Sequence, residues 1–231
     1  MNILSDKEIV LLCNQLYLPN GGDKFDFYDP GTTDGICWAV KKIDGVVYIG
    51  LRGSVTVQDW LRDFTAIADP FSHAALGPCH PGFLKGLNGL WQEIKAKYGN
   101  GPYVVFGHSL GAGRTCILVG MMVLDGAIVL RRVCFGEPKP AFQKLANIIK
   151  SVPAVSYRNG DTHGHDVVTD VPLSIPPQEY VHPVPLISVC ASPTIEITLK
   201  LGVFAFHHMP LYVEALNNVK IKKVGRKHKL F

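Results

Sequence analysis

Short apolar runs rich in β-branched residues alternate along this chain with longer stretches of helical periodicity. The short runs predict strands at Ile36–Val40, Val46–Leu51, Tyr103–Phe106, Arg132–Phe135, Ala154–Tyr157 and Ile195–Leu199. The longer stretches predict helices at Asp6–Leu16, Val57–Ile67, Gly82–Lys97, Leu110–Leu124, Ala141–Lys150 and Met209–Asn217. Alternation of strand and helix predicts an α/β fold with a mostly parallel central sheet flanked by helices. In such sheets ligands bind at the carboxyl ends of the strands, so the following loops are the places to look for chemistry.

One of these loops, Gly107-His108-Ser109-Leu110-Gly111, fits the pattern G-x-S-x-G. It follows a predicted strand and begins a predicted helix, which is the context that a nucleophilic serine on a sharp turn requires. The glycines allow strand and helix to cross closely. The Leu110 amide then lies at a helix N-terminus, where it can stabilise an oxyanion. We expect His108 to pack beneath the site, because successive side chains on such a turn point apart.

A serine hydroxyl needs an imidazole base, and the imidazole needs a carboxylate that orients it. On the α/β-hydrolase fold, where such turns carry the nucleophile, the order along the chain is Ser, then Asp or Glu, then His. Asp161, Asp166 and Asp170 all follow the predicted strand Ala154–Tyr157, and the residues alone do not choose among them. His207 and His208 are the candidate bases, because they follow the last predicted strand and precede a helix.

A second oxyanion donor is expected from an earlier loop between a strand and a helix. Arg52-Gly53-Ser54 ends the predicted strand Val46–Leu51 and precedes the helix expected near Val57. Ser54 can offer its amide and hydroxyl to the oxyanion. Its alternative role is that of a helix N-cap.

From about Val46 to Leu216 these motifs resemble the class 3 lipases, the fungal-lipase-like branch of the α/β-hydrolases. Gly-His-Ser-Leu-Gly-Ala at 107–112 is similar to the nucleophile turn of that family. The segment 51–54, followed by Asp-Trp-Leu-Arg-Asp at 59–63, is similar to its oxyanion segment and lid helix, and the short distance from there to His80 implies a short lid. His-Pro-Gly-Phe at 80–83 and Phe-Gly-Glu-Pro at 135–138 resemble two further family motifs.

The resemblance also selects among the acids and bases. Residues 166–172, Asp-Val-Val-Thr-Asp-Val-Pro, are similar to the family's D-x-V-x-x-x-P, whose first residue is the acid, which implies Asp166. A histidine five residues before Tyr212 implies His207 as the base, in a bacterial-type ending of the family. Phe206 stands where an acidic residue usually precedes that histidine, so His208 is kept as the alternative base.

Composition is typical of a globular protein. The chain has 231 residues, of which 47% are hydrophobic and 18% charged, and its longest apolar runs are too short to span a bilayer. The net charge of +4 is uneven, because residues 219–231 hold six Lys or Arg and no acid, whereas residues 1–218 hold 17 basic and 19 acidic residues. We therefore predict one domain over residues 1–218 and a basic C-terminal tail over 219–231. The body lacks a basic stripe with interleaved aromatics, so a nucleic-acid partner is not expected.

The six cysteines lie at least 18 residues apart without any CxxC pair, a spacing that favours free thiols in a reducing compartment. Residues 1–20 resemble no secretory signal, so a cytoplasmic location is expected, with secretion by another route as the alternative.

Together these features predict a serine hydrolase of carboxylic esters, a lipase acting on acylglycerols through Ser109, Asp166 and His207. Ser54 and Leu110 are the predicted oxyanion donors. The chemistry requires neither an organic cofactor nor a metal. Expected partners are a lipid or ester substrate and, peripherally, a lipid surface. The alternatives are a phospholipase, a small-ester esterase, or a non-catalytic lipid-binding module on the same fold.

Overall fold

The computed structural model describes residues 2–32, 35–54, 71–160, 164–174 and 179–218. The predicted helix Val57–Ile67, with the short lid that it would form, lies within residues 55–70, outside the described residues. The basic tail, residues 219–231, also lies outside them. The division into a domain and a tail therefore stays a prediction.

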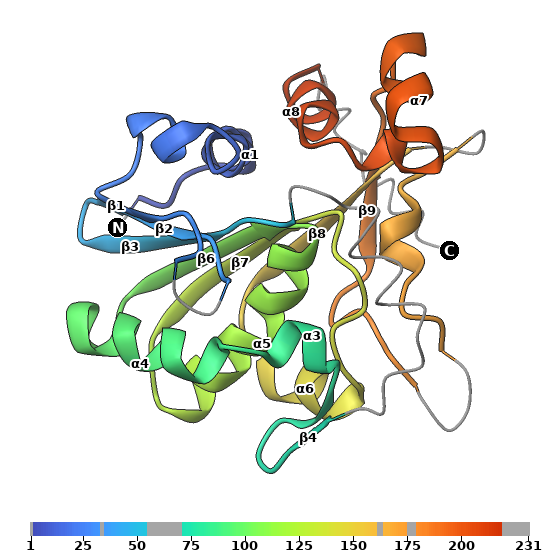
Figure 1. Cartoon of the computed structure of the whole chain (residues 1–231). Coiled ribbons are helices and arrows are strands. Elements are labelled where there is room, and N and C mark those ends of the chain that lie inside the picture. The colour runs from blue at the N-terminus through green and yellow to red at the C-terminus, as the bar shows by residue number, and fades with distance from the viewer. Residues whose placement is uncertain (1, 33–34, 55–70, 161–163, 175–178, 219–231) are drawn as a thin grey trace, which may run out of the picture.

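A seven-stranded sheet forms the centre of the molecule, in the order β1-β2-β3-β6-β7-β8-β9 (Figure 1). Its strands are β1 (Phe27–Asp29), β2 (Trp38–Ile43), β3 (Val46–Leu51), β6 (Tyr103–His108), β7 (Val129–Phe135), β8 (Ala154–Asn159) and β9 (Leu186–Val189). The first three strands pair antiparallel, and all pairs from β3 to β9 are parallel. A separate hairpin consists of β4 (Phe71–His73) and β5 (Gly77–Cys79). The expected mostly parallel sheet is confirmed.

Helices cover both faces of the sheet. Helices α1 (Asp6–Gln15) and α8 (Met209–Asn218) pack on one face, and α3 (Pro81–Leu84), α4 (Leu87–Tyr98), α5 (Leu110–Leu124) and α6 (Gln143–Ile149) lie on the other (Figure 1). The other helical segments of the described residues are α7 (Ile195–Leu201) and the 3-10 turns η1 (Pro19–Asp23), η2 (Val167–Asp170) and η3 (Gly202–His207). Within the described part of the chain, no helix combines the length and apolarity needed to cross a membrane.

Strand β3 shows why the sheet separates two apolar cores. Val47, Ile49 and Leu51 pack into the core beneath α4 and α5, whereas Val46 and Tyr48 pack into the core beneath α1 and α8. Successive side chains of a strand point to opposite faces, so a strand buried on both faces reads as a continuous apolar run. Because β3, β6 and β7 are neighbouring parallel strands, their carboxyl ends lie next to each other.

Two predicted elements differ in the structure. The predicted strand Ile195–Leu199 is the helix α7, because the Thr194 side chain caps its N-terminus by accepting from the Ile197 amide. The predicted helix Gly82–Lys97 is divided into α3 and α4, because Gly86 adopts a left-handed conformation with φ 80° between them. Accordingly, His207 is the last residue of the 3-10 turn η3 and His208 comes directly after it, so both follow the helix α7 rather than a strand.

Candidate active site

The turn between β6 and α5 holds Ser109 in a strained conformation. Its φ is 60° and its ψ is −130°, in a region that residues other than glycine rarely adopt. A Cβ at Gly107 would lie 2.7 Å from the Gly111 carbonyl, and a Cβ at Gly111 would collide with the Leu51 carbonyl. The glycines of G-x-S-x-G are therefore needed so that β6, α5 and the end of β3 can meet. The Ser109 side chain itself is fully buried.

The predicted oxyanion loop lies directly against this turn. A Cβ at Gly53 would be 2.6 Å from the Ser109 Cβ and 2.9 Å from the His108 carbonyl oxygen. Ser54 follows it and is partly exposed. Leu110 begins α5, so its amide is one of the N–H groups that lack a partner within the helix. The two predicted donors thus stand on the segments that flank Ser109, while their roles stay predictions.

Asp166 and His207 are brought together in the buried interior. Asp166 Oδ2 accepts a hydrogen bond from His207 Nδ1 at 2.6 Å and a second from the Tyr212 hydroxyl at 2.5 Å. Asp166 Oδ1 accepts from the Val168 amide at 2.9 Å, where Asp166 caps η2. Both carboxylate oxygens are therefore satisfied, and the contact at Nδ1 orients the ring so that Nε2 is left as the basic atom. Burial and the neighbouring Asp166 charge raise the pKa of Tyr212, which keeps its hydroxyl protonated as the donor.

The alternatives that the sequence left open have different surroundings. His208 is half-buried, and burial lowers its pKa, but it is His207 whose ring contacts the Asp166 carboxylate. Asp170 instead pairs with His165, Nε2 to Oδ2, at 2.8 Å. Asp161 lies outside the described residues. The geometry thus favours Asp166 and His207, the pair that the resemblance implied.

Two further residues fix this pair in place. Gly136, with φ 55°, lies so close to it that a Cβ there would be 2.6 Å from Asp166 Oδ2 and 2.8 Å from His207 Nδ1. Asn159, at the end of β8, donates to the carbonyls of Ala191 and Phe206 at 3.0 and 3.1 Å, so it fastens the chain just before His207. The sequence signal for Gly136 was its place directly after a strand in the Phe-Gly-Glu-Pro motif.

His108 packs beneath the site, as expected. It is buried, and its ring stacks on that of His207 with centroids 4.5 Å apart and an angle of 25°. Burial and the neighbouring His207 hold the pKa of His108 well below its usual value, so the ring is neutral. Its Nδ1 lies 2.6 Å from the hydroxyl of Tyr17, a residue for which sequence reasoning assigned no role. No local signal marks Tyr17, because the contact joins residues 91 positions apart.

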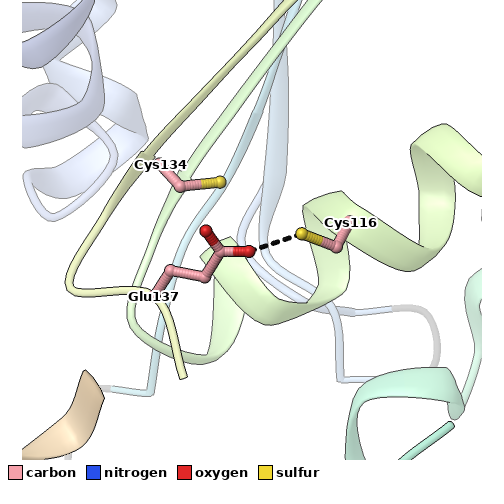
Figure 2. A group of neighbouring side chains, drawn as sticks. All are labelled: Cys116, Cys134 and Glu137. Carbon is pink, nitrogen blue, oxygen red and sulfur yellow. Dashed lines mark hydrogen bonds between the residues drawn. The ribbon is translucent and has the colours of Figure 1, made fainter. Parts of the chain in front are cut away.

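One cluster of potential metal ligands lies inside the described part of the chain. Cys116, Cys134 and Glu137 place their ligand atoms within 4.8 Å of one another (Figure 2). Arg132 Nη1, however, donates to all three, at 2.7 Å to Cys116 Sγ, 3.0 Å to Cys134 Sγ and 2.9 Å to Glu137 Oε1. A guanidinium therefore holds the position that a cation would take, and these residues do not fit a metal ion.

Two buried polar atoms are left over at the centre of the site. Ser109 Oγ and His207 Nε2 make no hydrogen bond to any of the residues that the structure describes. One is a hydroxyl that can donate and the other is a ring nitrogen that can accept, and each is costly to leave unpaired. Nucleophile and base often approach closely only once substrate is bound. The arrangement can therefore support proton transfer from a serine to an oriented imidazole.

A mostly parallel sheet flanked by helices, with a strained serine at the turn after a central strand, defines an α/β-hydrolase architecture. The chain belongs to the class 3 lipase family, because the family profile described as Lipase (class 3) matches residues 48–175.

Relatives of this chain include two fungal enzymes. It is 28% identical over 176 residues to the secreted mono- and diacylglycerol lipase A of Penicillium cyclopium, a match that covers 70% of this chain and 54% of the relative. It is 28% identical over 133 residues to the secreted mono- and diacylglycerol lipase 1 of Fusarium solani, covering 54% of this chain and 39% of the relative. The match thus spans 54% of the length of one of these curated relatives and 39% of the other.

Solved structures support the fold. The native propeptide complex of the Rhizomucor miehei lipase superposes with a TM-score of 0.61 at 17% identity, covering 81% of this chain and 70% of that one. This likeness shows a shared architecture.

Proposed function

We propose that this protein hydrolyses carboxylic esters of acylglycerols through an acyl-enzyme. The observation that carries the proposal is the Asp166–His207 hydrogen bond of 2.6 Å, buried beside the strained turn that holds Ser109. The names of the two fungal relatives support mono- and diacylglycerols as the substrate class.

In the first half-reaction, Ser109 Oγ attacks the ester carbonyl while His207 Nε2 takes its proton. The negative charge on the tetrahedral oxygen is stabilised by the amides of Leu110 and Ser54. Asp166 stabilises the imidazolium, which then gives its proton to the leaving alcohol oxygen. In the second half-reaction water gives a proton to His207 and attacks the acyl-enzyme, and the proton returns to Ser109 as the free fatty acid leaves.

A series of p-nitrophenyl esters from short to long acyl chains tests this proposal. Ser109→Ala and His207→Ala are expected to lower kcat by at least about a thousandfold. His208→Ala is the matched control, because it removes a neighbouring imidazole that makes no hydrogen bond to Asp166, and we expect it to keep kcat within a few-fold of the wild type. Loss of activity in His208→Ala but not in His207→Ala would contradict the assignment of the base.

The chain-length optimum of the same series separates the alternatives. A lipase prefers long acyl chains, a small-ester esterase prefers short ones, and a phospholipase hydrolyses phosphatidylcholine in a parallel assay. Wild-type protein that turns over no ester but still floats with lipid vesicles would favour the non-catalytic lipid-binding module.

A peripheral contact with the lipid surface is part of the proposal. Ile195 and Leu199 on α7 and Val203 on η3 are 82%, 83% and 69% exposed and recur at intervals of four residues. On α7 this spacing places Ile195 and Leu199 on one side of the helix, and Val203 follows Gly202, whose φ of 55° ends that helix. The segment stands away from the sheet (Figure 1) and leads directly to His207. Exposed apolar side chains on a segment this close to His207 can enter a lipid surface and hold the active site next to it.

Flotation with phosphatidylcholine vesicles tests the contact. Ile195→Ser combined with Leu199→Ser is expected to lower the vesicle-bound fraction several-fold while hydrolysis of a soluble short-chain ester is kept. Leu124→Ser combined with Ile128→Ser is the matched control. These side chains are also exposed, at 50% and 57%, but they lie near the amino end of β7, whereas the active site lies at the carboxyl ends of the strands. Equal binding by both double variants would refute the contact.

A cytoplasmic location is also kept as a proposal. Five of the six cysteines, namely Cys13, Cys37, Cys79, Cys116 and Cys134, are buried free thiols. The two fungal relatives are named as secreted proteins, so fractionation of the source cells is the deciding measurement.

A further inference from the structure

Three segments far apart in the chain meet at the hydroxyl of Tyr17. The Gly53 amide donates to this oxygen at 3.1 Å, and the oxygen lies 2.6 Å from His108 Nδ1. On the other side of the same ring, His108 Nε2 lies 3.0 Å from the His207 carbonyl oxygen. The oxyanion loop, the nucleophile turn and the segment carrying the base are therefore connected through one hydroxyl and one imidazole.

The direction of each hydrogen bond follows from what each group can donate. A neutral imidazole has one N–H and one acceptor nitrogen, and the His207 carbonyl only accepts, so the proton of His108 is on Nε2. His108 Nδ1 must then accept, and the Tyr17 hydroxyl must be its donor. With its proton used in this way, the Tyr17 oxygen receives the Gly53 N–H in a lone pair. In each of these three hydrogen bonds only one of the two groups can be the donor, so the direction of all three is fixed.

The protonation states that this direction requires are those that burial favours. Burial and nearby His207 lower the pKa of His108 well below its usual value, so this ring stays neutral even beside an imidazolium at His207. Burial also raises the pKa of Tyr17, so its hydroxyl keeps its proton.

We propose that Tyr17 is a positioning residue for ester hydrolysis, which fixes the Gly53–Ser54 loop against Ser109 and, through His108, the backbone of His207. This role rests on the proposed function. Its physical basis is the short path from Gly53 to the predicted oxyanion donor. The Tyr17 hydroxyl holds the Gly53 N–H, which sets the plane of the peptide bond before Gly53, and the Ser54 amide follows one residue later. Gly53 is also in contact range of Ser109, since a Cβ there would lie 2.6 Å from the Ser109 Cβ and 2.8 Å from the Tyr17 hydroxyl.

Tyr17→Phe removes this one oxygen, and Tyr48→Phe is the matched control. Tyr48 is fully buried in the same core that α1 helps to cover, and its hydroxyl also accepts a backbone amide, from Leu4 at 2.9 Å. We expect both variants to lower the urea midpoint by similar amounts. On p-nitrophenyl butyrate, Tyr17→Phe is expected to lower kcat at least about tenfold with KM within twofold, since positioning of a donor acts on the transition state. Tyr48→Phe should keep both constants within twofold.

Two further readouts separate positioning from a merely structural role. The rate at which a fluorophosphonate labels Ser109 should fall about as much as kcat, because the phosphoryl oxygen uses the same oxyanion donors. Ser54→Ala keeps the backbone amide but removes the hydroxyl that Ser54 can also offer to the oxyanion. In a double-mutant cycle, Tyr17→Phe and Ser54→Ala should be less than additive in kcat, because both act through the Gly53–Ser54 loop. If Tyr17→Phe does not fold, His108→Gln replaces it, since the Gln amide can still donate to the His207 carbonyl but offers Tyr17 no acceptor at the Nδ1 position.

The outcomes distinguish this role from the function on which it rests. If wild type and Tyr48→Phe hydrolyse the ester and Tyr17→Phe equals them in kcat and labelling rate, the role of Tyr17 is refuted and the function stands. Full additivity with Ser54→Ala also refutes it. If neither the wild type nor Tyr48→Phe hydrolyses any ester, the proposed function fails and the role of Tyr17 fails with it.

Discussion

Gly136→Ala tests how closely the Asp166–His207 pair is fixed. Its added Cβ would lie 2.6 Å from Asp166 Oδ2 and 2.8 Å from the nearest atoms of the His207 ring. Ordinary contact of a Cβ begins near 3.4 Å, so the carboxylate must retreat by about 0.8 Å and the ring by about 0.6 Å. A misplacement of about 1 Å in catalytic groups costs about a hundredfold in rate.

The backbone adds a separate cost. Gly136 has a φ of 55°, and a residue with a Cβ in the left-handed region costs about 1–2 kcal/mol. Gly126→Ala isolates this term, because Gly126 has a φ of 76°, lies just after α5, and has no atom within 4 Å of the place where its Cβ would be. We therefore expect Gly136→Ala to lose more free energy of unfolding than Gly126→Ala, because it adds the clash with the pair to the same backbone cost, and Gly136→Ala alone to lose activity.

Hydrolysis of a soluble p-nitrophenyl ester and urea unfolding followed by circular dichroism measure the two effects separately. The expected result is a kcat about a hundredfold lower in Gly136→Ala and close to the wild type in Gly126→Ala. If Gly136→Ala keeps kcat within threefold of Gly126→Ala, then displacement of this pair does not limit the reaction, and the reasoning is refuted.

Two further predictions concern stability. Arg132→Met leaves the fully buried Glu137 carboxylate without its cation and should lower the free energy of unfolding by about 3–5 kcal/mol. The double variant with Glu137→Leu should recover much of that loss, and urea unfolding measures both variants. Burial lowers the pKa of His80 to about 4, so the unfolded chain binds more protons than the folded one between about pH 6.5 and 4, and the free energy of unfolding should fall as the pH is lowered through this window. His80→Asn can still cap the Gly82 amide and should show a shallower slope in urea unfolding at successive pH values; an unchanged slope would contradict this assignment.

The sequence predicted those parts of the fold in which buried apolar residues recur along the chain. β3 and α5 have the predicted bounds, since all residues of β3 are buried and α5 is apolar over nearly its whole length. The short strands β1 and β9 were not predicted, because each has only three or four residues and is partly exposed at an edge of the sheet. Local periodicity carries little signal at that length.

The error at Ile195–Leu199 has a different cause. Isoleucine and threonine favour strands mainly because they pack well on a half-buried pleated surface. Helix α7 has no buried residue, so this packing term is absent, and the cap at Thr194 with Glu196 in the first turn and Lys200 in the last decides the local conformation. The β propensity of such a run therefore predicts a strand only where a sheet is present to receive it.

The residues of the site, too, include some that could be predicted from the sequence and some that could not. Ser109 could be found locally, because the close approach of β6, α5 and the end of β3 leaves no room for a Cβ at Gly107 or Gly111, and that requirement is visible as a motif. Tyr17 could not be found, because its surroundings are a loop 36 residues away and a ring 91 residues away. A hydroxyl that joins two such segments imposes no requirement on its own neighbours in the chain. Residues that position a site by bridging elements are therefore expected to escape motif-based reasoning even where the reacting groups do not.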